Sequence, residues 1–255
     1  MRIEGAKKKL VFATELSKSY DAADMAVIRD KVRNAPENIR ILWNLAEGQM
    51  KILDKNYYDT AHYATADKGV RLNYFKDTVD NPRQYGIAPH CTLFHELGHL
   101  IDHFMGRQVY FHSEYFKGWK FGYTLRQEAE DYINATLNRL KREALAAGKS
   151  AKSIKKADAY DFIEKEITSM EHRQKADVSD IWEGATNGKV SDGWGHGKKY
   201  WKADSYNLTR EAFAEMFCAV INKPESLLQI KRYFPESYKV FEEMIEEFVK
   251  NATKI

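Results

Sequence analysis

The sequence predicts an α+β fold that is mainly helical, with a small sheet in its N-terminal half. Most long segments repeat apolar residues at helical spacing, and strand-like patterns are confined to residues 49–77. The 255 residues, 44% of them hydrophobic, are enough to bury a sizeable core. We therefore expect a single domain over residues 1–255. We divide it into four parts. These are an N-terminal helical segment (1–35), a sheet with an apolar helix (36–105), a helical insertion (106–190), and a part with a glycine-rich loop and C-terminal helices (191–255).

Charge and composition exclude several classes of protein. A net charge of +3 is small for this length and gives no basis for a nucleic-acid or acidic membrane partner. No window has the uncharged apolar length of a membrane-spanning helix, and the apolar part of the N-terminus, "LVFA", is too short for a secretory signal. Two cysteines, Cys91 and Cys218, fit a reducing compartment. We expect a cytoplasmic protein.

The N-terminal half contains two helices followed by strands. Residues 20–33 are amphipathic, and residues 36–48 form a second helix that begins near Pro36 and ends at a glycine. Residues 49–59 change to a strand pattern. Residues 60–77 resemble a hairpin, because two aromatic and β-branched runs meet at the turn "ADKG". Residues 81–89, rich in proline and glycine, predict a loop.

The C-terminal half is predicted to be helical, with two interruptions. A basic linker covers residues 148–158, and a glycine-rich loop with aromatic residues covers 183–202. Apolar residues at helical spacing predict helices over 92–104, 124–148, 159–173, 208–221 and, on either side of Pro235, 224–250.

The apolar helix "TLFHELGHLIDHF" contains the pattern H-E-x-x-H at His95, Glu96 and His99. Residues four apart lie on one face of a helix, so both imidazoles can bind one Zn²⁺ at about 2.0–2.1 Å. Glu96 lies beside such an ion and can take a proton from a metal-activated water. The alternative is a pair of buried histidines with other hydrogen-bond partners. The apolar surroundings favour the metal, since it satisfies both rings at once.

A catalytic zinc site needs a third protein ligand and an open position for water. A third histidine in the pattern H-E-x-x-H-x-x-G-x-x-H is excluded, because Asp102 and Met105 occupy the last two positions. His103 would lie about 12 Å from His95 on a straight helix, too far to bind the same ion. Asp102 either accepts a hydrogen bond from a ligand histidine or another donor, or simply ends the helix with a polar residue.

The better candidates lie in "TREAFAEMFCAV". Glu211 and Glu215 are four residues apart on an otherwise apolar helix, where a positive ion would offset the cost of burying two carboxylates. Glu211 is the candidate ligand and Glu215 the candidate hydrogen-bond acceptor behind a ligand. The alternative is an exposed acidic stripe balanced by Arg210 and lysines. Cys218 continues the stripe and is expected to be an apolar packing residue.

Two further features bear on catalysis. The loop before this helix offers His196 and Tyr200, with Tyr206 further on, as hydrogen-bond donors to the oxyanion of a tetrahedral intermediate. The alternative is an aromatic residue buried in the core. The hairpin near "GVRLNYF" offers an edge strand with which an extended peptide could pair.

The segments "HELGHLID" and "EAFAE" together resemble the gluzincin group of zinc metallopeptidases. The pattern is similar to the catalytic domain of anthrax lethal factor and to the Pro-Pro endopeptidases. This resemblance implies a zincin-like fold, zinc bound by His95, His99 and Glu211, and Glu96 as the base. Asp102 also matches an aspartate of the lethal factor zinc helix.

Most of residues 36–250 is also similar to zinc-peptidase-like domains encoded with phage minor head proteins, through "GWGHGKKYW" and "YFPESYKVFEEMI" among other segments. Two features depart from the toxin-like families. Glu211 lies 112 residues after His99, a longer gap, which indicates an inserted helical segment. Asp204 stands where those families have a tyrosine oxyanion donor.

We therefore expect a zinc-dependent endopeptidase that acts on a protein or peptide substrate. The alternative is a non-catalytic, zinc-stabilised structural or assembly protein of a phage, with phage structural proteins as partners and a location in the virion. A second rival, a toxin-like effector with a narrow host target, would be favoured by a translocation segment, and we find none.

Overall fold

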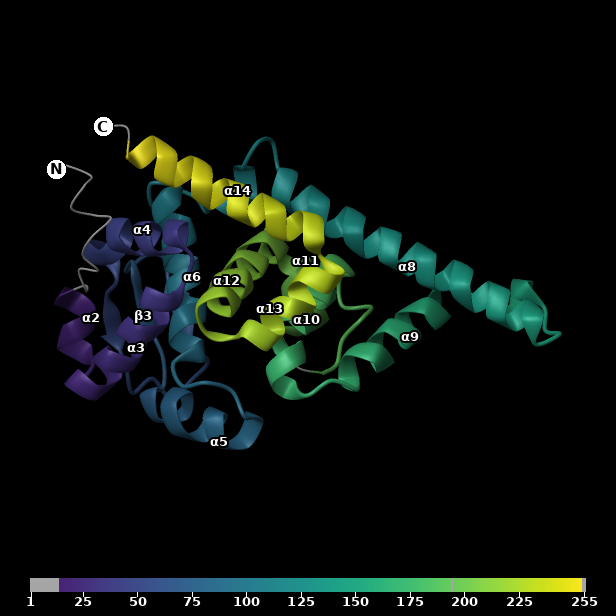
Figure 1. Cartoon of the computed structure of the whole chain (residues 1–255), viewed down its shortest axis with the longest axis horizontal. Helices are drawn as coiled ribbons and strands as arrows, with labels where there is room; N and C mark the ends of the chain where they lie inside the picture. Colours follow the sequence, from purple (N-terminus) through teal and green to yellow (C-terminus); the bar gives the residue numbers. More distant parts are fainter. Residues whose placement is uncertain (1–13, 194, 254–255) are drawn as a thin grey trace.

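The computed structural model describes residues 14–193 and 195–253 (Figure 1). Within these residues the fold is mostly helical with one small three-stranded sheet, which confirms the predicted α+β, mainly helical class. The first thirteen residues of the predicted N-terminal helical segment lie outside the described part of the chain. No helix in the described ranges is long and apolar enough to cross a membrane.

From residue 14 onward, three helices precede the sheet: α2 (Thr14–Ser19), α3 (Ala22–Asn34) and α4 (Glu37–Ala46), with α4 followed by a 3₁₀ turn, η1 (Glu47–Gln49). The Asp21 carboxylate caps α3 by accepting two backbone N–H groups of its first turn at 2.9 Å. The predicted apolar face of α3 is buried through Met25, Ile28 and Val32. Both predicted helices of this region are therefore present.

The sheet has the strand order β1-β3-β2, where β1 is Ile52–Asp54, β2 is His62–Ala64 and β3 is Gly69–Arg71. Strands β2 and β3 form the predicted hairpin, with Tyr63 opposite Val70, and β1 pairs with β3 in parallel. A Cβ at Gly69 would lie 2.7 Å from the Leu53 side chain, so the close approach of these strands requires glycine. Strand β2 is left at the edge of the sheet.

The segment predicted as a loop at 81–89 is partly helical. A short π-helix, η2 (Lys76–Asp80), leads directly into α5 (Asn81–Tyr85). Pro82 lies in the first turn of α5. Gly86 ends the helix in the left-handed conformation, with φ 65°. The loop prediction was wrong for residues 81–85.

Helices α6 (Cys91–Met105) and α12 (Asn207–Asn222) pack against each other at the centre of the molecule. A Cβ at Gly98 would lie only 2.8 Å from Ala214 Cα, so the two backbones approach closely at this point. The buried Asp77 carboxylate caps α6, accepting hydrogen bonds from Thr92 N at 2.8 Å and Leu93 N at 3.1 Å.

The chain between these two helices contains α7 (His112–Tyr115), α8 (Lys120–Ala146), η3 (Ala151–Ser153), α9 (Lys156–Thr168), α10 (His172–Ala185) and α11 (Gly197–Ala203). Helix α8 extends away from the body of the molecule, and α9 folds back beside it (Figure 1). The single helix predicted over 159–173 is broken at 169–171. Helices α10 and α11 were not predicted, and α11 lies in the segment predicted as a glycine-rich loop.

The C-terminal helices are α13 (Pro224–Tyr233) and α14 (Pro235–Ala252), divided at Pro235 as predicted. Helix α14 runs alongside the first half of α8 (Figure 1). Glu243 of α14 forms ion pairs at 2.6 Å with Lys117 and Lys120 near the beginning of α8. The first half of α8 packs into the core through Phe121, Leu125, Ala129 and Ile133, and its far half contacts α9 and η3.

Candidate metal centre

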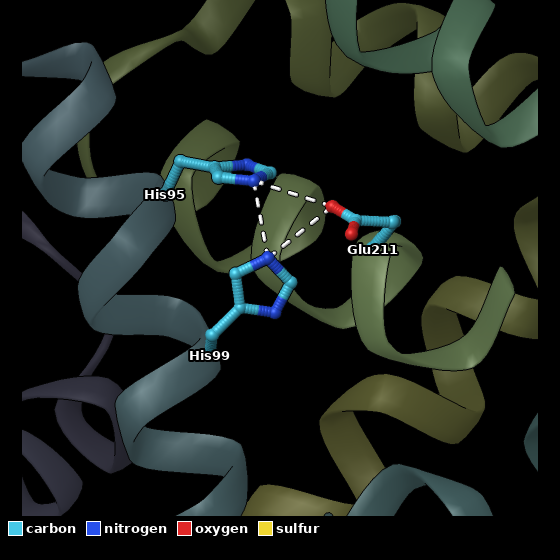
Figure 2. A group of neighbouring side chains, drawn as sticks. All are labelled: His95, His99 and Glu211. Carbon is cyan, nitrogen blue, oxygen red and sulfur yellow. Dashed lines mark hydrogen bonds and ion pairs between the residues drawn. The ribbon is translucent and has the colours of Figure 1, made fainter. Parts of the chain in front are cut away.

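Three side chains from two helices converge on one point (Figure 2). His95 and His99 extend from successive turns of α6, and Glu211 faces them from the first turns of α12. The Nε2 atoms of the two histidines are 3.2 Å apart, and Glu211 Oε2 lies 3.3 Å from His95 Nε2 and 3.2 Å from His99 Nε2. The predicted juxtaposition of these three residues is therefore present.

The spacing of these atoms matches a tetrahedral metal site. Ligand atoms about 2.0–2.1 Å from a tetrahedral Zn²⁺ are separated from one another by about 3.3–3.4 Å. The three measured separations, 3.2 to 3.3 Å, agree with that value. Glu211 Oε2 is also buried and accepts no hydrogen bond from the described residues. One ion in front of the three atoms would satisfy this oxygen and both imidazoles.

The charge of the cluster also suits a cation. Burial by itself would raise the pKa of Glu211, but His99, His95 and His196 outweigh it, and the pKa lies well below its usual range. Burial would likewise lower the pKa of His95, yet Glu215 and Glu211 raise it well above the ordinary value. The buried carboxylates thus favour a positive charge at the cluster, and a divalent metal ion would supply that charge.

Glu215 lies behind His95, as predicted. Its Oε2 atom is 3.4 Å from His95 Nδ1, on the side of the ring opposite the cluster. Burial would raise the pKa of Glu215, but His95 and Lys223 lower it to about 2. An ionised carboxylate at Nδ1 favours the tautomer whose Nε2 lone pair is free to bind a metal. The alternative interpretation, an exposed acidic stripe, is wrong, because Glu211 and Glu215 are both buried.

Tyr200 contacts the other oxygen of the candidate ligand. Its hydroxyl donates a short hydrogen bond to Glu211 Oε1, and burial together with Glu211 raises the pKa of Tyr200. The hydroxyl is therefore directed at the carboxylate. This arrangement orients Glu211 so that Oε2 faces the two histidines.

Glu96 is 5% exposed. The backbone N–H of Tyr63 in β2 is close enough to its carboxylate to oppose part of the effect of burial on its pKa. Burial raises the pKa of Glu96 above the ordinary value. A carboxylate with a raised pKa that lies next to a metal ligand is suited to accept and return a proton.

A cavity of about 470 Å³ opens in front of the cluster. It is lined by the segment around β2, including Ala61 and Tyr63, and by Phe111 and Arg210. A second cavity, of about 920 Å³, extends along the same segment toward Arg83 and Tyr85. Both cavities are lined by His95, Glu96 and His196. The site thus borders open space in both cavities.

His196 lies at the rim of this space. Its Nδ1 is 3.3 Å from the buried Asp180, its Nε2 is 3.7 Å from Glu211 Oε1, and its ring stacks on Tyr200 at 4.1 Å. Burial would lower the pKa of His196, but the hydrogen bond to Asp180 and the charge of Glu211 raise it to about 9. Asp180 and Tyr200 therefore hold the His196 ring beside the cluster, and its raised pKa favours the protonated form that donates hydrogen bonds.

Asp180, His196 and Glu211 also offer ligand atoms within 4.8 Å of one another. They fit a metal site less well than the first group, because His196 faces Asp180 with Nδ1 and Glu211 with Nε2. The lone pairs of these two nitrogens point in different directions, so an ion bound to one of them lies away from the carboxylate that faces the other. The group is better described as two carboxylates joined by a histidine.

The remaining candidates have other contacts. Asp102 is fully buried and accepts hydrogen bonds from Ser113 N at 2.8 Å and Ser113 Oγ at 2.5 Å, so it contacts a nearby donor at the start of α7. Burial raises its pKa to about 7. His103 Nδ1 lies 2.9 Å from the Tyr63 hydroxyl, outside the cluster. Cys218 is buried and packs against Cys91 O at 3.3 Å.

Sequence analysis missed the residues of α10 that support the site. Asp177, Asp180 and Glu183 recur every three residues and are all buried. Asp180 contacts His196, and Glu183 accepts hydrogen bonds from Gly197 N at 3.1 Å and Trp201 Nε1 at 2.9 Å. A row of acids at this spacing among apolar residues was the available signal.

Comparison with models of known protein families gave no match, and comparisons with curated proteins and with solved structures gave none either.

Proposed function

We propose that this chain is a zinc-dependent endopeptidase with a zincin-like fold of the gluzincin type. The observation that carries the proposal is the convergence of His95 Nε2, His99 Nε2 and Glu211 Oε2 at tetrahedral spacing in front of an open cavity. Three protein ligands and an accessible fourth position are typical of a catalytic zinc site. A zinc ion with a purely structural role is usually closed by four protein ligands, which argues against the phage structural alternative.

Zinc bound at this position would lower the pKa of a water molecule to about 7 and polarise the carbonyl of the scissile bond. Glu96 then accepts the proton of the attacking water and returns it to the leaving amine. Its carboxylate is buried, and its raised pKa suits a group that must both take up and release a proton.

His196 is the better of the two predicted oxyanion donors. Tyr200 directs its hydroxyl at Glu211, whereas the His196 ring borders both cavities and carries a proton near neutral pH. A charged imidazole next to the developing oxyanion stabilises the transition state in a partly desolvated site. Tyr200 is assigned to orienting the ligand carboxylate.

The substrate is proposed to lie along β2. This strand is at the edge of the sheet and borders the cavity, so an extended peptide can lie alongside it. Two cavities that both border Glu96 are lined by residues of the segment 57–63. Space for a length of extended chain along this segment favours an endopeptidase over an exopeptidase.

The experiment that tests this proposal compares wild type with Glu96→Gln on a peptide library, with bound zinc measured in the same samples. Wild type should cleave members of the library. The variant should retain zinc and lose about 10²–10⁴-fold in rate, the usual contribution of a positioned general base. Glu143→Gln, at an exposed position on α8, is the control and should cleave like wild type.

If zinc-loaded wild type cleaves no peptide in the library, this result would contradict the peptidase proposal and favour the structural alternative. Wild-type rates in Glu96→Gln would show that hydrolysis, if present, arises elsewhere. The cleavage-site profile would also define the substrate preference.

A further inference from the structure

A buried carboxylate on α10 holds the loop that carries His196. Glu183 is 3% exposed, and its Oε1 accepts a hydrogen bond from Ser191 Oγ at 2.7 Å. Its Oε2 accepts two more, from Gly197 N at 3.1 Å and Trp201 Nε1 at 2.9 Å. A buried carboxylate needs such donors, and these three lie on both sides of His196 in the chain. One side chain thus fixes the loop before and after this histidine.

The loop passes directly over the acids of α10. A Cβ at Gly195 would lie 2.5 Å from Asp180 Oδ1 and 2.9 Å from Glu183 Oε2. The backbone of Gly195 also has a φ of 126°, which only glycine adopts readily. No side chain fits at this point between the loop and the helix. The position of the loop is therefore set by direct contact with the two carboxylates.

The fixed loop places two aromatic side chains beside the metal centre. The Trp201 ring packs against Tyr200 and His196, with ring centroids 5.1 and 5.5 Å away. The Tyr200 hydroxyl in turn donates to Glu211 Oε1, the oxygen that does not face the two histidine ligands. A continuous path of direct contacts therefore leads from Glu183 to a candidate zinc ligand.

We propose that Glu183 is a positioning residue, which holds Tyr200 against Glu211 and thereby raises the zinc affinity of the site. Carboxylates that bind metals are themselves hydrogen-bonded, and these outer partners keep the ligand in the orientation that binds the ion. The inference rests on the proposed function only in requiring that zinc binds at His95, His99 and Glu211. It does not require peptide hydrolysis.

The test measures zinc affinity directly. Metal-free protein is titrated with zinc in competition with a chromogenic chelator at pH 7.5, for wild type, Glu183→Leu and Glu183→Gln. Glu183→Leu should bind zinc about tenfold more weakly, at the lower end of the 10–100-fold range seen when outer partners of metal ligands are changed.

Glu183→Gln should restore the affinity of wild type. Its amide oxygen can accept the hydrogen bonds of Gly197 N and Trp201 Nε1. Its NH₂ group can donate to the Ser191 hydroxyl, which is able to accept as well as donate. Rescue by this variant would show that the hydrogen bonds of the side chain, and not its charge, position the loop.

Glu128→Leu is the matched control. Glu128 on α8 also accepts three hydrogen bonds, from Glu236 N at 2.7 Å, Ser237 N at 2.8 Å and Ser237 Oγ at 2.5 Å. These donors lie in the first turn of α14, which provides none of the candidate ligands. The control should lose thermal stability but keep the zinc affinity of wild type.

A double-mutant cycle tests the route through Tyr200. Tyr200→Phe removes the hydroxyl that contacts Glu211 and should also weaken zinc binding. If Glu183 acts through Tyr200, the double variant should bind zinc no more weakly than the weaker single variant, because both changes remove the same interaction. Losses that multiply in the double variant would overturn the inference.

Gly195→Ala guards against misfolding of Glu183→Leu. This exposed position retains every carboxylate, and the added Cβ would push the loop away from Asp180 and Glu183. Zinc affinity should fall in the same direction as in Glu183→Leu. Gly193→Ala is its control, because Gly193 also has a positive φ, 79°, yet a Cβ there meets nothing within 4 Å among the described residues. Gly193→Ala should bind zinc like wild type.

The outcomes separate the two proposals. Folded Glu183→Leu that binds zinc as tightly as wild type would overturn this inference alone, and if Glu183→Leu does not fold, the same result in Gly195→Ala would do so. Glu183→Gln that is as weak as Glu183→Leu would also overturn it. Weakened binding with rescue in Glu183→Gln, in a protein that cleaves no peptide, would support this inference and overturn the peptidase. Wild type that binds no zinc would overturn both.

Discussion

Both ring nitrogens of His196 face a carboxylate, an arrangement that it shares with His95. Asp180 at Nδ1 and Glu211 near Nε2 raise its pKa to about 9, against the effect of burial. The ring is 34% exposed and borders the space where the proposed substrate binds. At neutral pH it therefore carries a proton that an oxyanion can use.

Changing His196 to glutamine should lower kcat about 10²–10³-fold with a small effect on KM, because the interaction is made mainly in the transition state. Zinc content should not change. In wild type, activity should fall as the pH rises and His196 loses its proton. This loss should occur at or below pH 9, because a bound zinc ion would lower the pKa of His196 from about 9. The measurement is the pH profile of kcat/KM, and an unchanged alkaline limb in His196→Gln would count against the role.

Local sequence patterns predicted several individual residues of the candidate metal centre. H-E-x-x-H identified His95, Glu96 and His99, because residues four apart on a helix must share a face. Glu211 was predicted from the cost of burying acids, and the structure places it beside both histidines. Asp180 was not predicted, because its partner His196 lies in a glycine-rich loop whose path no periodicity reveals.

The contact between α6 and α12 determines how closely their side chains approach. At Gly98, between the two candidate histidine ligands, the absence of a side chain lets α6 approach the backbone of Ala214. Ala214 is one turn from Glu211 on α12. The glycine within H-E-L-G-H thus helps to set the distance from the histidines to the carboxylate.

Gly98→Ala should therefore weaken zinc binding without altering a ligand. The added Cβ would lie 2.8 Å from Ala214 Cα, so the helices must separate, and overpacking of this kind typically costs about 1–3 kcal/mol of stability. Gly48→Ala is the control, because a Cβ there meets nothing within 4 Å. Equal zinc affinity in the two variants, measured by chelator competition, would contradict this account of the helix contact.

Elements with a clean amphipathic pattern were predicted well, as α3, α4 and α12 illustrate. Helix α10 was missed because three buried acids interrupt its apolar face, and their burial is compensated by partners distant in sequence. Helix α5 was missed because proline and glycine signal a loop, although both also suit the two ends of a short helix. In α10, contacts between residues distant in the sequence determine the structure, and local sequence patterns do not reveal them.

Over the whole molecule, the proposed ion would join segments that are far apart in the chain. Glu211 follows His99 by 112 residues, and the intervening chain contains the long α8 and the returning α9 (Figure 1). Local sequence patterns do not determine whether two such distant helices meet, so the α6–α12 contact had to come from the structure. A ligand that binds only the folded state stabilises it, by about 4 kcal/mol at a concentration 1,000 times its Kd.

The central claim is that one zinc ion is bound jointly by His95, His99 and Glu211. It is tested most directly by elemental analysis of purified wild type and Glu211→Gln, prepared side by side without chelators. The account predicts about one zinc per chain in wild type and a large loss in the variant, since an amide is a poor substitute for a carboxylate ligand. Less than half an equivalent in wild type, or a full equivalent in Glu211→Gln, would contradict it.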